Sequence, residues 1–264
     1  MTAALYFIHG MWSTPAVWSG LRARFEAAGY TTFAPALPYH DRLRSEPPPP
    51  ELATLSVRDY VEYLVDDISR LDVAPVIVGH SLGGFLAQAV AARVQPAGLI
   101  LLSPGPTSAI AAVGVDPVRT VWNIVSRWGW WKRPSMIDAA PARWGIYNNV
   151  PEDIASAEID ALVWDSGRVL AELSFPWARR DNSAAVDYAR LAMPALVVVG
   201  NEDRITPAGV ARATARHLTG AVDYHELPGV GHWLFHAPVV EQVGDLMADW
   251  LAALSPVTVE LSPR

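Results

Sequence analysis

The sequence predicts an α/β fold, in which a mostly parallel central sheet carries helices on both of its faces. Short apolar runs rich in β-branched residues alternate along the chain with longer segments whose apolar residues recur at helical spacing. Strands that are separated by helices pair in parallel, because a right-handed crossover brings each new strand beside an earlier one. With 264 residues, 51% of them hydrophobic, the chain can bury one large core.

The first part of the chain opens with a buried strand over Leu5–Ile8. A helix follows, with Thr14 as its N-cap, Pro15 in its first turn and Gly29 at its end. The next expected elements are a strand over Thr31–Leu37, a helix from Val57 to Leu71, a strand over Val76–Val78, a helix over Leu82–Gln95 and a strand over Leu99–Leu102. The segment Ser56–Asp59 resembles a capping box for the helix from Val57 to Leu71.

The regular alternation stops between Ser103 and Arg190. This stretch holds seven of the eleven tryptophans of the chain, namely Trp122, Trp128, Trp130, Trp131, Trp144, Trp164 and Trp177. The alternation then resumes with a strand over Ala195–Val199, a helix over Pro207–Leu218, a strand over Val222–Leu227 and a helix from Pro238 to Leu254. We therefore expect three segments: a first core part (1–103), a helical insertion over one end of the sheet (104–190) and a second core part (191–264).

The composition argues against several classes of partner. The formal net charge is −7 and the pI is about 5.5, so no basic surface is expected that could bind nucleic acid. The absence of cysteine excludes disulfides, thiolate metal sites and a cysteine nucleophile. No apolar run is long enough to span a bilayer, and the N-terminus lacks the basic region of a signal peptide. We therefore expect a cytoplasmic protein, whose oligomeric state the sequence does not indicate.

The strongest chemical signal is the pentapeptide Gly79-His80-Ser81-Leu82-Gly83, which lies between a predicted strand and a predicted helix. This is the G-x-S-x-G pattern in the strand–turn–helix setting of a nucleophile elbow. A serine on so sharp a turn adopts a strained backbone, and side chains at the flanking glycines would collide with the adjoining strand and helix. The alternative is an ordinary glycine-rich turn that contains an incidental serine.

With this motif, the chain from about Leu5 to Leu254 resembles the α/β-hydrolase superfamily, specifically its serine esterase and lactonase branch with a cap. In that family the catalytic residues follow in the order Ser, Asp or Glu, His. The segment after the Ala195–Val199 strand resembles the family's acid turn, which implies Asp203 as the acid rather than its neighbour Glu202. An N-cap for the next helix is the structural alternative for Asp203.

The resemblance also implies His232 as the base, because it follows the last strand and a glycine. Three other histidines are less well placed: His217 is on a helix, His225 is inside a strand and His236 comes four residues later. The spacing of His232 and His236 would suit two metal ligands, but no third ligand accompanies them, so we expect no metal.

The segment from His9 to Trp12, at the end of the first strand, resembles the family's H-G-x oxyanion segment. By this resemblance, the backbone N–H groups of Met11 and Leu82 form the oxyanion hole. The alternative is a plain turn at the end of a strand. The full set implies that Ser81 forms an acyl-enzyme, that His232 transfers the proton and that Asp203 orients His232, without any cofactor.

The tryptophan-rich insertion resembles the cap of many family members and predicts a small, apolar, ester-like substrate with an acyl or aryl group. Most of its tryptophans are expected to fill the cap's own core, and one or two to reach the pocket. The residues expected to line the pocket are Trp12, His80, Trp128, Trp131 and Trp233. Ester, lactone, thioester, amide and carbon–carbon bonds stay open as targets. Two further alternatives are a non-hydrolytic triad enzyme, such as a perhydrolase, lyase or cofactor-free oxygenase, and a non-catalytic binding protein of the same fold.

Overall fold

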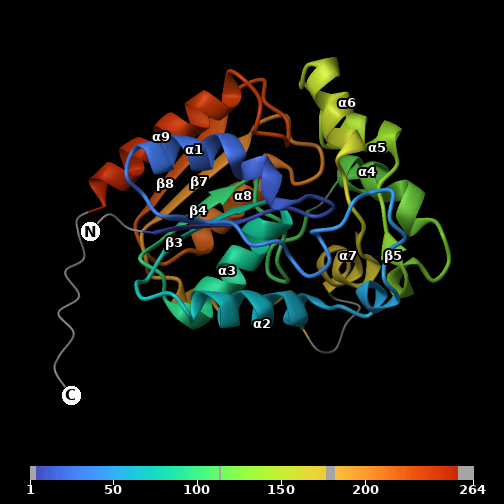
Figure 1. The fold of residues 1–264 in the computed structure, drawn as a ribbon, viewed down its shortest axis with the longest axis horizontal. Helices are drawn as coiled ribbons and strands as arrows, with labels where there is room; N and C mark the ends of the chain where they lie inside the picture. The colour runs from blue at the N-terminus through green and yellow to red at the C-terminus, as the bar shows by residue number, and fades with distance from the viewer. Residues whose placement is uncertain (1–3, 113, 177–181, 255–264) are drawn as a thin grey trace.

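The computed structural model describes residues 4–112, 114–176 and 182–254, and within them six strands form one parallel sheet in the order β2-β1-β3-β4-β7-β8 (Figure 1). These strands are β1 (Leu5–Ile8), β2 (Thr32–Phe33), β3 (Val76–His80), β4 (Gly98–Leu102), β7 (Ala195–Gly200) and β8 (Val222–Leu227). The chain leaves β1 for β2 on one side and returns to β3 on the other. The carboxyl ends of β1 and β3 therefore meet at a topological switch point, where sheets of this kind bind ligands. The predicted α/β fold class is confirmed.

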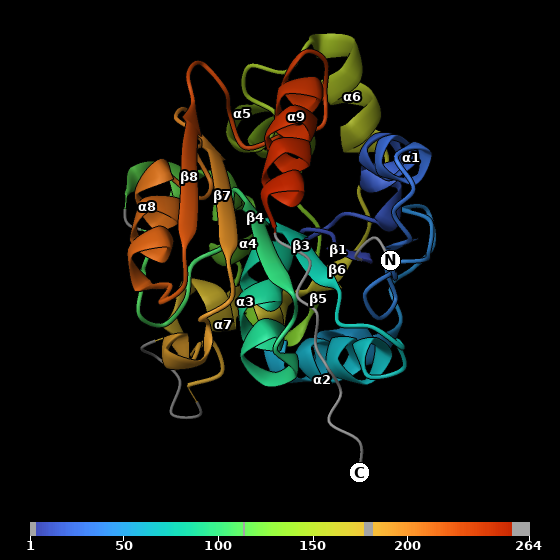
Figure 2. The same ribbon diagram turned by 90° about the vertical axis from the view of Figure 1, so that its left-hand side faces the viewer.

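Helices cover both faces of the sheet (Figure 2). One face carries α1 (Ser19–Ala27) and α9 (Val239–Ala253), and the other carries α2 (Val57–Ile68), α3 (Leu82–Val94) and α8 (Ala208–His217). Short 3-10 helices, η1 (Pro15–Trp18) and η2 (Pro50–Ala53), precede α1 and α2. The predicted capping box of α2 is present, with reciprocal hydrogen bonds between Ser56 and Asp59.

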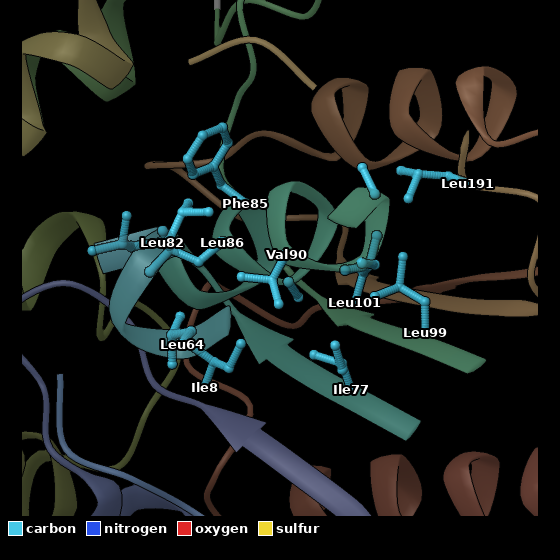
Figure 3. Packing of buried hydrophobic residues seen from close by; sticks show 14 of the residues in the cluster. Ile8, Leu64, Ile77, Leu82, Phe85, Leu86, Val90, Leu99, Leu101 and Leu191 are labelled. Carbon is cyan, nitrogen blue, oxygen red and sulfur yellow. The ribbon is translucent and has the colours of Figure 1, made fainter. Parts of the chain in front are cut away.

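Two apolar cores follow from the alternation of side chains along the strands. Ile77, Leu99 and Leu101 point toward α2 and α3, while Val78 and Ile100 point toward α1 and α9. Figure 3 shows α3 laid over the first group of strand residues. Because β3 and β4 are buried on both faces, their sequences are continuous apolar runs rather than alternating ones.

The predicted strand over Thr31–Leu37 is wrong in its length, because β2 contains only Thr32 and Phe33. Pro35 and Pro38 have no N–H to donate to a ladder. The N–H of Leu37 donates instead to Nε2 of His9 (3.1 Å). The segment after β2 is thereby attached to the end of β1 through a side chain.

The stretch between β4 and β7 contributes mainly helices, which Figure 1 shows gathered beyond one end of the sheet. Its elements are α4 (Val115–Val125), η3 (Trp130–Lys132), β5 (Pro134–Ser135), α5 (Ala139–Gly145), α6 (Glu152–Asp160), β6 (Asp165–Ser166), α7 (Gly167–Ser174) and η5 (Tyr188–Arg190). Strands β5 and β6 form a small antiparallel pair. In the described ranges no helix has both the length and the apolar character that crossing a membrane requires.

Candidate active site

Ser81 occupies the turn between β3 and α3 with φ +56° and ψ −122°, a conformation that L residues rarely adopt. The flanking residues must be glycine, because a side chain at either position would collide with the backbone. A Cβ on Gly79 would overlap the carbonyl group of Gly83, and a Cβ on Gly83 would overlap the carbonyl oxygen of Ile8. The turn can therefore form only where two glycines let the chain pass this close to β1 and α3.

A cavity of about 200 Å³ opens at the carboxyl ends of β1 and β3. Ser81 and His232 both line it, together with Met11 and Leu82. No Asp, Glu, Lys or Arg is among the described residues that line it. Most of the lining is apolar, which lowers the dielectric around Ser81.

Asp203 and His232 form a buried pair behind this cavity. Nδ1 of His232 donates to Oδ2 of Asp203 (2.7 Å), and both side chains are almost fully enclosed. Oδ1 of Asp203 accepts the backbone N–H groups of Ile205 (3.0 Å) and Thr206 (2.8 Å). The backbone turn that follows Asp203 thus fixes the carboxylate, and the carboxylate fixes the orientation of the imidazole. It does not cap α8, which was the structural alternative.

The competitor of this acid points elsewhere, because the carboxylate of Glu202 accepts a hydrogen bond from Nδ2 of Asn149 (2.6 Å). The three other candidate histidines also lie apart from the site. His217, His225 and His236 do not line the cavity. The structure therefore brings together the three residues that the resemblance selected, and leaves their sequence neighbours outside.

Thr206 belongs to the same cluster, and the sequence did not indicate it. Its hydroxyl lies 2.9 Å from Oδ2 of Asp203, 3.1 Å from Nδ1 of His232 and 3.1 Å from the carbonyl oxygen of Ser103. A hydroxyl has one proton and two lone pairs, so Thr206 can donate to one oxygen while it accepts from the imidazole. It reinforces the orientation of the pair.

The oxyanion segment adjoins the serine. A Cβ on Gly10 would lie 3.1 Å from Cβ of Ser81, so the backbone at Gly10 packs closely against the serine. Within the described part of the chain, the backbone N–H groups of Met11 and Leu82 donate to no carbonyl or side chain. Two unpaired donors at the rim of one cavity are the arrangement that stabilises an oxyanion.

His80 lines the cavity as predicted, but as a neutral group. Its Nε2–H donates to the backbone carbonyl of His232 (3.1 Å), and the two rings lie 4.8 Å apart. Complete burial lowers the pKa of His80 well below its ordinary value, and the neighbouring His232 lowers it further. His80 therefore supports the loop that carries the base and does not compete with it for a proton.

Two of the tryptophans expected in the pocket are there, and two are not. Trp12 and Trp233 line the cavity, whereas the prediction for Trp128 and Trp131 is wrong. Trp128 is 88% exposed, and Trp131 packs edge-on against it with ring centroids 5.1 Å apart. The aromatic side chains that the insertion does contribute to the cavity are Tyr147 and Phe175.

The remaining tryptophans of the insertion have different roles. Trp130 is buried in the insertion's apolar cluster, as expected for most of them. Trp122 is 60% exposed, against that expectation. Trp144 lies under the guanidinium groups of Arg119 (4.1 Å) and Arg204 (4.8 Å). Trp177 lies outside the described residues.

A second buried aspartate–histidine pair, Asp165 with His40, lies behind the oxyanion segment and was also missed. Neither residue lines the cavity. As for metals, the described residues contain no group of three or more His, Asp or Glu side chains that could hold an ion.

The chain is similar to known proteins in both sequence and fold. The sequence profile described as the alpha/beta hydrolase family matches residues 5–244. A monoacylglycerol lipase of Mycolicibacterium smegmatis is 25% identical over 240 residues, which are 87% of this chain and 81% of that protein. A solved monoacylglycerol lipase of Paleococcus ferrophilus superposes with a TM-score of 0.70 at 21% identity, covering 95% of this chain and 94% of the other. A pyrethroid hydrolase from Sphingobium faniae gives 0.67 at 18% identity, covering 96% and 98%.

Proposed function

The chain belongs to the alpha/beta hydrolase family, and on that basis we propose that it is a serine hydrolase with Ser81 as nucleophile, His232 as base and Asp203 as the acid that orients the base. Its substrate is a carboxylic ester, lactone or thioester with an apolar acyl or aryl group. One observation carries the proposal: Ser81 and His232 line the same cavity, while Asp203 holds His232 from the side away from it.

The reaction follows from this arrangement. His232 accepts the hydroxyl proton of Ser81 at Nε2 as Oγ attacks the substrate carbonyl. The carbonyl oxygen becomes an oxyanion, which the N–H groups of Met11 and Leu82 stabilise, each such donor contributing about 3 kcal/mol. His232 then passes its proton to the leaving oxygen or sulfur, and the acyl group stays on Ser81. A water molecule, deprotonated by His232, releases the acid and restores the serine. These steps need no cofactor.

The substrate class rests on the cavity wall. Its described lining carries no ionised carboxylate, ammonium or guanidinium, and Leu170, Tyr147 and Phe175 give it an apolar surface. A charged acyl group would lose its hydration there without gaining a partner. The similar proteins are named for monoacylglycerol and pyrethroid, which are uncharged esters, and this supports a substrate without a charged group. The three-segment division with a cap over 104–190 belongs to this proposal, as does a cytoplasmic location.

The test is active-site labelling with a fluorophosphonate, read by mass spectrometry of the intact protein. Wild type is expected to gain one label on Ser81, and Ser81→Ala to gain none. Ser156→Ala, on the exposed face of α6, is the control and should label as wild type does. Folded wild-type protein that stays unlabelled and cleaves no p-nitrophenyl ester would refute the proposal, and would leave the binding-protein alternative.

Esters of matched length then test the substrate class. The two substrates are p-nitrophenyl butyrate and mono-p-nitrophenyl succinate. They differ mainly by the terminal carboxylate of the succinate ester. We expect kcat/KM for butyrate to exceed that for succinate at least 100-fold, because the carboxylate would be buried unpaired. Equal rates would contradict the apolar class while leaving the hydrolase assignment intact. Product analysis with and without peroxide separates hydrolysis from perhydrolysis.

A further inference from the structure

The second aspartate–histidine pair joins the insertion to the sheet. Asp165, in β6, and His40, in the loop after β2, are both fully buried. Nε2 of His40 lies 3.1 Å from Oδ2 of Asp165, in an ion pair off the ideal hydrogen-bond direction. Nδ1 of His40 donates to the carbonyl oxygen of Pro38 (3.1 Å). Both ring nitrogens thus face oxygens, which is the pattern of an imidazolium.

The charge of this pair is stable in the fold. Burial by itself would raise the pKa of Asp165, but the charge on His40 and hydrogen bonds from Tyr60 and Ser166 lower it below its ordinary value. Burial lowers the pKa of His40, and the charge on Asp165 more than offsets this, so that the pKa rises overall. A carboxylate and an imidazolium result.

Each carboxylate oxygen of Asp165 has two polar partners. Oδ1 accepts from the hydroxyl of Tyr60 (2.8 Å) on α2 and from the N–H of Ser166 (2.6 Å). Oδ2 accepts from the N–H of Trp12 (3.1 Å) and faces His40. Asp165 therefore links four segments of the chain, and one of them is the oxyanion segment.

Trp12 is held to the insertion at three points. Besides the bond to Asp165, its carbonyl oxygen accepts from the N–H of Val163 (2.8 Å), and its indole N–H donates to Oγ of Ser135 (3.3 Å). Its φ is +58°, a conformation that persists only where the surroundings enforce it. The N–H of Trp12 belongs to the peptide that joins it to Met11, so its bond to Asp165 fixes the peptide next to the one that carries the oxyanion donor.

The other side of the segment is also fixed. Nδ1–H of His9 donates to the carbonyl oxygen of Gly10 (2.9 Å), while Nε2 accepts from Leu37. The rings of His9 and His40 lie 5.1 Å apart. Met11 thus lies between two anchored neighbours, Gly10 on the side of β1 and Trp12 on the side of the insertion.

We propose that Asp165, with His40 as its counter-ion, is a positioning residue that holds the segment Gly10–Trp12 so that the N–H of Met11 faces the oxyanion. The inference rests on the proposed hydrolase function and adds to it a dependence of the oxyanion hole on the insertion. Asp165 touches no reacting atom; it acts through the backbone of Trp12. Displacing an oxyanion donor by a fraction of an ångström weakens the transition state more than it weakens substrate binding.

The test is Asp165→Asn. An amide NH₂ accepts no hydrogen bond, so either orientation of Asn leaves two of the former donors unpaired. We expect kcat on p-nitrophenyl butyrate to fall by about 10- to 100-fold while KM stays within about threefold. Affinity for butylboronic acid, whose adduct with Ser81 places an anionic oxygen in the hole, should fall in parallel with kcat. Hydrogen exchange of the peptide spanning residues 9–14 should accelerate.

Glu172→Gln is the matched control. Glu172 is a fully buried carboxylate of the same insertion that accepts a backbone N–H, that of Val57 (2.8 Å), but at the start of α2, away from the oxyanion segment. It should lower Tm without changing kcat, boronate affinity or exchange at residues 9–14. If Asp165→Asn lowers Tm while kcat and boronate affinity stay at wild-type values, the proposal is overturned.

Two outcomes keep the inference separate from its premise. Wild type that cleaves no ester refutes the hydrolase function, and the exchange comparison then still reports whether Asp165 holds the segment. If Asp165→Asn does not fold, Tyr60→Phe removes a single donor and keeps the charge. It should lower kcat by about fivefold at unchanged KM, since one hydrogen bond is worth about 1 kcal/mol. An unchanged kcat in that variant overturns the proposal.

Discussion

The protein contains two buried aspartate–histidine pairs, and their surroundings give them different roles. In the first, His232 lines the cavity and Asp203 lies behind it. In the second, His40 and Asp165 are both fully enclosed and neither reaches the cavity. The same two side chains can thus form part of a proton-transfer chain or a structural link, depending on whether the imidazole has access to substrate.

The hydrogen bonds that the two aspartates accept also differ, in how far away in sequence their donors lie. Asp203 takes its backbone donors from its own turn, at Ile205 and Thr206, so its geometry is local. Asp165 has one local donor, the N–H of Ser166, and takes its others from Tyr60 and Trp12, far away in sequence, so its geometry depends on how distant segments pack. A local acid orients one residue, whereas an acid with distant donors fixes several segments relative to each other.

Each pair is accompanied by a neutral histidine. His80 packs against His232 with ring centroids 4.8 Å apart, and His9 packs against His40 at 5.1 Å. Burial keeps the pKa of His80 well below its ordinary value and lowers the pKa of His9 to about 3. Both are uncharged near neutral pH, so each can use one N–H to hold a neighbouring carbonyl group.

The largest expected loss of kcat comes from Asp203→Asn, which tests whether the first pair differs in role from the second. The NH₂ of Asn would face Nδ1 of His232, because the other oxygen position is required by the N–H groups of Ile205 and Thr206. His232 would then carry its proton on Nε2 and could not accept one from Ser81. We expect kcat to fall by about 10⁴-fold, far more than for Asp165→Asn, with little change in KM.

Steady-state kinetics on p-nitrophenyl butyrate measure this loss, and Tm checks that the variant is folded. Glu202→Gln is the control, because Glu202 is exposed and its carboxylate contacts Asn149 rather than His232. Similar losses in the two variants, or similar losses for Asp203→Asn and Asp165→Asn, would contradict the separate roles assigned to the two pairs.

The first pair could be predicted from the sequence because its physical requirements are local. Gly79 and Gly83 are needed wherever a serine sits on this turn, and a strand on one side with a helix on the other defines the setting. Asp203 lies three residues past the end of β7 and His232 five residues past the end of β8, and strand ends that share one edge of a sheet bring them together. Their assignment used this order and position together with the resemblance to the α/β-hydrolase superfamily.

The second pair could not be predicted in that way. Asp165 follows no strand of the main sheet, and its partners come from segments that no motif connects to it. Thr206 was missed for a related reason: its side chain matters through three-dimensional contacts with Ser103 and His232, not through its spacing.

The aromatic residues of the insertion show a further limit. On α4, Val121 lines the cavity while its neighbour Trp122 is mostly exposed, and Trp128 just beyond the helix is more exposed still. Apolar residues lie on both sides of this helix, so composition alone does not reveal which side faces the pocket. A cluster of tryptophans predicts apolar surface, but not its direction.

The paired histidines also make the fold sensitive to acid. In the unfolded chain His9 and His80 take up protons with a pKa near 6.5, whereas in the fold both stay neutral well below that pH. The unfolded state therefore binds more protons below about pH 6.5, and stability falls as the pH falls. Each histidine contributes about 1.4 kcal/mol per pH unit, or roughly 2.7 for both. His40, with its raised pKa, contributes stability that is complete below pH 6.5 and is lost at higher pH.

Urea unfolding at pH 7, 6 and 5 measures this dependence. His80→Gln should lower the slope below pH 6 by about 1.4 kcal/mol per pH unit, because the Gln amide can still donate to the carbonyl oxygen of His232 but does not titrate. If the free energy of unfolding of wild type does not change between pH 6 and 5, then His9 and His80 do not stay neutral in the fold below their ordinary pKa. An unchanged slope in His80→Gln would exclude His80 as one of the sources.

The smallest expected loss of kcat comes from Thr206→Val. This variant tests how much the hydroxyl of Thr206 adds to Asp203 in orienting His232. Valine keeps the shape and the backbone N–H that binds Asp203, and removes only the hydroxyl shared by Asp203, His232 and Ser103. Losing it costs about 1 kcal/mol, so kcat should fall by about fivefold with KM unchanged. Thr120→Val removes a buried hydroxyl that donates to the carbonyl oxygen of Asp116 in α4, and should lower Tm without this loss of kcat. If both variants behave alike, the hydroxyl of Thr206 contributes only to stability, and Asp203 with its two backbone donors is sufficient to orient the imidazole.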